Sequence, residues 1–139
     1  MPDKETILIV DDEADMREIL KARLEALGFA AQTASGGPEA LLKIKERIPD
    51  LVLLDIMMEG MDGIQVKTRL NQDETTEHLP VIFLSAKTHT QSKVQGLAVG
   101  ADDYVTKPFD LEELDARIKM ALNRRRYYEQ VSMTDALTG

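Results

Sequence analysis

The chain has 139 residues, enough for one domain of ordinary size and too few for two independently packed domains. With 43% hydrophobic and 30% charged residues, its composition excludes a disordered or collagen-like chain. The absence of cysteine excludes disulfides and thiolate zinc sites. The net charge of −8 argues against direct nucleic-acid binding by this domain, because DNA and RNA backbones attract positive surfaces.

No apolar run approaches the roughly 20 residues of a transmembrane helix, and the first residues lack the basic and apolar regions of a signal peptide. We therefore expect a soluble, cytoplasmic protein with no membrane partner.

Strands and helices are predicted to alternate along the chain. Unbroken apolar runs at residues 7–10, 51–54 and 81–84 are typical of strands buried on both faces of a parallel sheet. Weaker strands are predicted at residues 30–34 and 103–106. Five helices are predicted between and after them, at residues 14–27, 38–47, 62–71 and 89–99 and from residue 111 onward. This alternation predicts an α/β doubly wound fold, for which one common strand order is 2-1-3-4-5.

Residues at the predicted helix ends support these boundaries. Gly28 and Gly100 are suited to end helices, and Ser35 is a candidate N-cap for the second helix. Asp110 is the predicted N-cap of the last helix, with Glu113 in the capping-box position. The last helix has no glycine or proline that would stop it before residue 130, so it is expected to continue as a connector.

The polar residues that follow the strands suggest a metal site. Asp11 and Asp12 follow the first strand and Asp55 follows the third, and these two strands are neighbours in the order 2-1-3-4-5. Three carboxylates at one sheet edge repel one another unless a cation neutralises them, and Mg²⁺ prefers such oxygen ligands. Taken alone, acidic strand ends are equally consistent with solvated loops.

Ser85 and Lys107 follow the fourth and fifth strands, which adds a hydroxyl and an ammonium group to the same edge. A carboxylate nucleophile, a metal site, a cation and a hydrogen-bond donor are what transfer of a phosphoryl group to an aspartate requires. The sequence therefore predicts this chemistry at the carboxyl edge of the sheet.

This set resembles the receiver domain of bacterial two-component response regulators, which has a flavodoxin-like (β/α)5 fold. The matching segments are Asp11-Asp12, Asp55, Asp62-Gly63, Leu84-Ser85-Ala86, Gly100-Ala101-Asp102-Asp103-Tyr104 and Lys107-Pro108-Phe109. The resemblance covers about residues 4–123 and implies that a sensor histidine kinase phosphorylates Asp55. Receivers of this type are not enzymes with turnover; they are signalling domains switched by phosphorylation.

The resemblance also assigns roles to the surrounding residues. It implies that Mg²⁺ is bound by Asp12, Asp55 and the backbone carbonyl of Met57, and by Asp11 mainly through water. Lys107 would contact the phosphoryl group, with a cis bond to Pro108. Ser85 and Tyr104 would form the switch that alters the surface of helix 4, strand 5 and helix 5.

That surface carries charged residues similar to those through which receivers of winged-helix transcription factors form symmetric dimers. The residues are Lys93, Asp102, Asp103, Glu113, Arg117 and Arg124. We expect a phosphorylation-promoted homodimer, with Lys93 paired to Glu113, Asp103 to Arg117 and Asp102 to Arg124 across the two-fold axis. A merely solvated charged face is the alternative.

One family feature is altered beside the phosphorylation site. Glu59 stands where receivers usually have proline, and Met57 and Lys87 flank the route of the water that would hydrolyse the aspartyl phosphate. The lifetime of the phosphorylated state is left open in both directions.

The tail suggests the output. Residues 134–139, Thr-Asp-Ala-Leu-Thr-Gly, resemble the opening of a GGDEF domain, the diguanylate cyclase module that makes cyclic di-GMP. We therefore expect a receiver at residues 1–123, followed at 124–139 by a signalling-helix linker and the truncated start of a GGDEF domain. Leu114, Ile118, Ala121 and Tyr128 lie near heptad spacing, which suggests a coiled coil interrupted by Arg125.

Four alternatives stay open at this point. The receiver could control a DNA-binding transcription factor, or stand alone. A phosphate-ester hydrolase with an aspartyl-phosphate intermediate usually has two aspartates one residue apart, whereas Asp11 and Asp12 are adjacent. A flavin-binding domain is disfavoured because the first loop presents carboxylates in the place of phosphate-binding donors.

Overall fold

The computed structural model describes residues 4–86, 94–95 and 98–138, with side chains up to residue 127. A five-stranded sheet forms its centre. The strands are β1 (Thr6–Val10), β2 (Ala30–Ala34), β3 (Leu51–Asp55), β4 (Val81–Ala86) and β5 (Asp103–Lys107). All neighbouring strands are parallel, in the order β2-β1-β3-β4-β5, which confirms the predicted doubly wound, flavodoxin-like fold.

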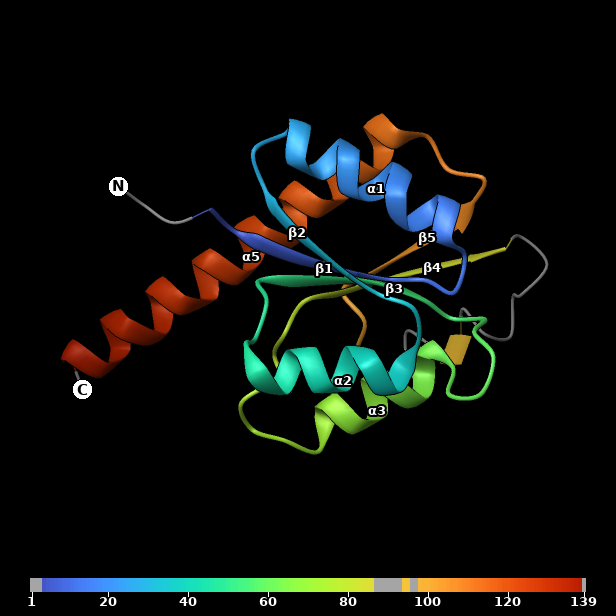
Figure 1. Ribbon diagram of the computed structural model, residues 1–139. Coiled ribbons are helices and arrows are strands. Elements are labelled where there is room, and N and C mark those ends of the chain that lie inside the picture. The colour runs from blue at the N-terminus through green and yellow to red at the C-terminus, as the bar shows by residue number, and fades with distance from the viewer. Residues whose placement is uncertain (1–3, 87–93, 96–97, 139) are drawn as a thin grey trace.

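Helices cover both faces of the sheet. They are α1 (Ala14–Ala26), α2 (Gly37–Glu46), α3 (Gly63–Asn71) and α5 (Leu111–Thr138). Helices α1 and α5 lie on one face and α2 and α3 on the other (Figure 1). Most of the predicted fourth helix, residues 89–99, lies outside the described residues, although Val94, Gln95 and Ala98 are helical.

Alternation along the strands explains why their sequences are apolar without interruption. Leu8, Val10, Val52 and Leu54 belong to the core beneath α2 and α3. Ile7, Ile9, Leu51 and Leu53 belong to the core beneath α1 and α5. Because successive side chains point to opposite faces, a strand covered on both sides needs apolar residues at every position.

The helix ends agree with the prediction at some positions and correct it at others. Gly28 has a positive φ of 97° after α1, a backbone conformation that glycine adopts without strain. The predicted N-cap Ser35 is wrong, since Gly36 is the N-cap of α2. Ser35 lies one residue earlier, where its amide and hydroxyl donate to Oε1 of Glu39 at 2.8 and 2.9 Å.

At the start of α5, Asp110 accepts a hydrogen bond from the amide of Glu112 at 2.9 Å, as an N-terminal cap does. Glu113 Oε1 accepts a hydrogen bond from Arg117 Nε at 3.1 Å. Glu113 therefore forms an ion pair within the helix, in place of the capping-box contact predicted for it.

The structure corrects the predicted coiled coil. Leu114, Ile118 and Ala121 are buried in the domain's own core and are not available to a second helix. Helix α5 nevertheless continues as predicted, to Thr138, and its C-terminal part extends away from the sheet (Figure 1). Within the described part of the chain, no helix combines the length and apolarity needed to cross a membrane.

Candidate functional site

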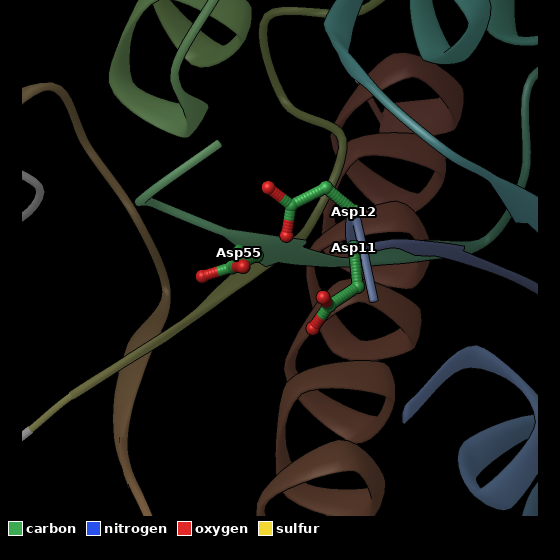
Figure 2. Close-up of side chains that lie close together, drawn as sticks. All are labelled: Asp11, Asp12 and Asp55. Atoms are coloured by element: carbon green, nitrogen blue, oxygen red, sulfur yellow. The ribbon is translucent and has the colours of Figure 1, made fainter. Parts of the chain in front are cut away.

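The strand register brings the predicted acidic residues together. Val10 of β1 pairs with Leu54 of β3, so the next residues, Asp11 and Asp55, lie side by side at the carboxyl edge of the sheet. Asp12 follows Asp11 in the connection to α1. One carboxylate oxygen from each of the three residues lies within 4.8 Å of the others. Figure 2 shows Asp11 and Asp12 coming from the end of β1 and Asp55 from the end of β3, with their carboxylates turned toward a shared space.

The three carboxylates differ in exposure. Asp11 is fully buried and Asp55 is 4% exposed, whereas Asp12 is exposed. Buried carboxylates require partners. Asp55 accepts a hydrogen bond on Oδ1 from the amide of Met57 at 3.3 Å. The cluster therefore has two carboxylates set into the domain and one that faces solvent.

Lys107 supplies the cation of the site. It ends β5, and its Nζ lies 3.0 Å from Oδ2 of Asp11 and 3.6 Å from Oδ2 of Asp55. Burial opposes the charged form of Lys107, but the hydrogen bond to Asp11 and the attraction of Asp55 outweigh it and raise the pKa of Lys107. The ammonium group is therefore charged and shared between two carboxylates.

Burial also changes Asp55. Its removal from water, reinforced by repulsion from Asp11, raises the pKa of Asp55 from 3.8 to about 6, against the opposing effect of Lys107. Asp55 is thus ionised at neutral pH, but its ionised form is less stable in the folded protein than in water. A further cation beside this carboxylate would stabilise the ionised form.

The charge balance of the cluster fits a divalent cation. Three carboxylates and one ammonium group leave a net charge of about −2, which Mg²⁺ would balance with the hard oxygen ligands it prefers. Asp12 and Asp55 are placed to bind such an ion, and Met57 is the second residue after Asp55. The residues present therefore fit the predicted metal site.

Ser85 lies in β4 beside this cluster. Asp55 pairs with Leu84 and Ala86 pairs with Lys107, so Ser85 lies between these two positions along the strand. Its side chain is buried, and among the described residues its Oγ has no hydrogen-bond partner. An unsatisfied buried hydroxyl is uncommon and is suited to donate to a group that binds nearby.

Tyr104, the other predicted switch residue, lies in β5 and packs partly buried against the core beneath α2 and α3. Its neighbour Asp103 belongs to the predicted dimer face. In this structure Arg117 Nη1 binds both carboxylate oxygens of Asp103, at 2.8 and 2.9 Å.

The predicted dimer face is therefore partly paired within one chain. Arg117 contacts both Asp103 and Glu113 of its own chain. Asp102 accepts a hydrogen bond from the amide of Val81 at 2.8 Å, and it lines the same cavity as Arg124. Lys93 lies outside the described residues. An interface that paired Asp103 with Arg117 between subunits would have to exchange contacts that already exist within each chain.

The sequence did not predict the roles of two residues that shape the site, Gly63 and Arg17. A Cβ atom added at Gly63 would overlap the carbonyl oxygen of Asp55 and lie 2.9 Å from Cα of Ile56, so only glycine lets α3 start this close to the end of β3. Arg17 donates from Nη1 to the carbonyl oxygen of Asp11 at 2.7 Å. Gly63 was visible as part of the Asp62-Gly63 pair, but its close approach to β3 had no sequence signal of its own.

Comparison with known protein families gives a match over residues 7–119 to the family described as response regulator receiver domain. A curated relative from Pseudomonas aeruginosa, the phosphate regulon transcriptional regulatory protein PhoB, is 50% identical over 119 residues, 86% of this chain and 52% of that protein. PhoB from Rhizobium meliloti is 46% identical over 120 residues, 86% of this chain and 53% of that protein. The chain spans about half the length of these relatives.

Solved structures show the same similarity. A putative response regulator from Chloroflexus aurantiacus superimposes with a TM-score of 0.83 at 36% identity, covering 87% of this chain and 99% of that one. The chemotaxis protein CheY4 of Vibrio cholerae has a TM-score of 0.81 at 28% identity, covering 86% of this chain and 99% of that one.

Proposed function

Because the chain belongs to the response regulator receiver domain family, we propose that it works in the cytoplasm, where Asp55 accepts a phosphoryl group from a sensor histidine kinase in a Mg²⁺-dependent reaction. One observation carries this proposal. Asp55 lies almost buried between two acidic residues and the ammonium group of Lys107, 3.6 Å away, at the carboxyl edge of a parallel sheet. Such an arrangement suits a carboxylate that accepts and binds a phosphoryl group better than one that is merely exposed to solvent.

The chemistry follows from the charges. Ionised Asp55 directs a carboxylate oxygen at phosphorus, and a new O–P bond forms as the P–N bond to the kinase histidine breaks and its electron pair leaves with the imidazole. Lys107 is close enough to bind an oxygen of the transferred group. When bound, Mg²⁺ supplies positive charge to the phosphoryl oxygens and to the crowded carboxylates.

The metal ligands are proposed as Asp12, Asp55 and the carbonyl of Met57, with Asp11 contributing through water. The contacts of Asp11 support this division. Its Oδ2 is already bound to Lys107 and its Oδ1 to the amide of Glu13, while Asp12 is exposed. Asp12 is therefore the freer of the two carboxylates.

Ser85 and Tyr104 are proposed as the switch. A phosphoryl group on Asp55 brings acceptor oxygens beside a buried hydroxyl that lacks a partner among the described residues. Movement of Ser85 toward that group would leave space that Tyr104 could enter. Phosphorylation would in this way favour one of two packings of β5 and the adjoining surface.

The signal would leave through a homodimer formed by the predicted fourth helix (residues 89–99), β5 and α5. Charges of both signs on this face make it suitable for two-fold self-association, in which ion pairs select geometry more than they supply affinity. Because Arg117 contacts Asp103 and Glu113 within one chain, dimerisation in the predicted pairing would exchange these contacts for contacts between chains.

Two outputs are supported by different observations. Residues 134–139 favour a diguanylate cyclase, in which receiver dimerisation would bring two cyclase domains together. The relatives from Pseudomonas aeruginosa and Rhizobium meliloti are named as transcriptional regulators, which favours a DNA-binding output. Assaying the full-length protein for cyclic di-GMP synthesis and for DNA binding separates the two.

The proposed phosphorylation is tested with acetyl phosphate and Mg²⁺. Intact mass should show one added phosphoryl group on the wild type and none on Asp55→Asn. Sedimentation with beryllofluoride should then show a monomer-to-dimer shift that Lys107→Ala reduces. An equal mass gain on Asp55→Asn would refute the assigned acceptor, and an unchanged sedimentation coefficient would refute the dimer.

A further inference from the structure

Asp11, in the connection between β1 and α1, is fully buried, and each of its polar groups has a hydrogen-bond partner. Asp11 donates its amide to the carbonyl of Ala34 at 3.2 Å. Its Oδ1 accepts from the amide of Glu13 at 2.9 Å, and its Oδ2 from Lys107 at 3.0 Å. The group that remains is the backbone carbonyl, which in a buried residue needs a donor.

Arg17 supplies that donor. Its Nη1 lies 2.7 Å from the Asp11 carbonyl oxygen, the length of a strong charge-assisted hydrogen bond. Arg17 lies in the first turn of α1, and its own amide donates to the carbonyl of Glu13 at 3.2 Å. Both ends of this arginine therefore bind the short segment that contains the acidic pair.

The carbonyl that Arg17 binds belongs to the peptide unit joining Asp11 to Asp12. Because that unit is planar, holding its oxygen restricts the orientation of the whole peptide, and with it the directions in which the Cα–Cβ bonds of Asp11 and Asp12 leave the backbone. Asp11 and Asp12 are two of the three carboxylates in the acidic cluster. The contact thus constrains the backbone from which both carboxylates extend, without touching either carboxylate.

We propose that Arg17 is a positioning residue for the magnesium site, an inference that rests on the proposed function. It holds the Asp11–Asp12 peptide in the orientation that directs both carboxylates toward Asp55. Partners that orient metal ligands in this way typically change metal affinity by about 10- to 100-fold when they are removed.

Electrostatics alone makes the opposite prediction. Arg17 carries a positive charge close to a cation site, so removing that charge should strengthen Mg²⁺ binding if Arg17 has no positioning role. Positioning predicts weaker binding. The direction of the change therefore separates the two explanations.

The test compares Arg17→Ala, Arg17→Lys and Lys21→Ala in the full chain. Lys21 is exposed on the same helix, so its substitution removes the same charge without touching Asp11. Isothermal titration with Mg²⁺ gives the dissociation constant, and urea unfolding in EDTA gives the stability of each protein without metal.

We expect the Mg²⁺ dissociation constant to rise at least tenfold in Arg17→Ala, to rise less in Arg17→Lys, which keeps a donor, and to stay within twofold in Lys21→Ala. The Mg²⁺ concentration that half-saturates phosphorylation should rise in parallel, while the rate at saturating Mg²⁺ recovers. Mg²⁺ binding by Arg17→Ala as tight as wild type, or tighter, would overturn the role of Arg17. Failure of the wild type to bind Mg²⁺ would instead refute the metal site and the proposed function.

Discussion

The tight packing of α3 against β3, the strand that ends at the proposed phosphoacceptor Asp55, makes Gly63→Ala a sensitive test of the site. A methyl group at Gly63 would overlap the Asp55 carbonyl oxygen and lie 2.9 Å from Cα of Ile56 and 3.1 Å from the carbonyl carbon of Asp55. Ordinary contacts between such atoms begin at 3.4 Å, so the start of α3 and the backbone of Asp55 and Ile56 must separate by at least about 0.5 Å, and we expect the end of β3 to take up part of this shift.

This displacement should have two measurable effects. Overpacking of this kind costs about 1–3 kcal/mol of stability. A reacting group displaced by 1 Å can lose about 100-fold in rate, so a shift of up to about half that size should slow phosphorylation of Asp55 by up to about tenfold. Rates of phosphoryl incorporation from acetyl phosphate, followed by intact mass, and urea unfolding measure the two effects separately.

Gly36→Ser is the matched control. A Cβ at Gly36 meets no atom within 4 Å, and the backbone there is extended, with a φ of −173°. Serine is also a favoured N-cap residue, so α2 should not be weakened. Wild-type rate and stability in Gly63→Ala would show that α3 does not constrain the position of Asp55.

Three further predictions follow from burial and pairing. In EDTA, Asp55→Asn should raise the free energy of unfolding by about 3 kcal/mol at pH 7, because the raised pKa of Asp55, about 6 against 3.8, destabilises the wild type as pH rises through that window. The gain should vanish below about pH 4, and urea titrations that show no pH-dependent gain would contradict it. Ser85→Ala should stabilise the protein by about 1 kcal/mol, because it removes a buried hydroxyl without a partner among the described residues. The same substitution should weaken the response to phosphorylation. A clear loss of stability in urea would show that the Ser85 hydroxyl does have a stabilising partner. Arg125→Ala removes a partly exposed 2.8 Å ion pair with Asp50 and should lower the free energy of unfolding by at most about 1 kcal/mol. It should nevertheless speed amide exchange in α5 beyond Leu122, the last core residue of that helix among those described. Unchanged exchange there would show that the pair does not hold the helix to the sheet.

Much of the fold was predictable because its signals are local. Apolar runs at β1, β3 and β4 are unbroken since each strand is covered on both faces, and Gly28 marks the end of α1 through a positive φ. The meeting of Asp11, Asp55 and Lys107 was also predictable, because the ends of parallel strands share one edge of the sheet.

The features that the sequence did not predict depend on which parts of the chain pack against each other, and residue spacing alone does not reveal this packing. Leu114 and Ile118 repeat as they would in a coiled coil, but the domain's own sheet covers them. Ser35 is as good a cap as its neighbour, and only the chain's path into α2 selects Gly36. The bond from Arg17 to the Asp11 carbonyl joins a side chain to a backbone atom, and no pattern of residue types records it.

The central claim is that the cluster of Asp11, Asp12 and Asp55 at the carboxyl edge of the sheet makes Asp55 an acceptor of a phosphoryl group. Fluorine NMR of the protein with beryllium fluoride tests this claim most directly. Beryllofluoride takes the place of that group, so bound fluorine signals should appear for the wild type only when Mg²⁺ is present, and should be absent for Asp55→Asn. The same bound signals from Asp55→Asn, or from the wild type in EDTA, would contradict the account.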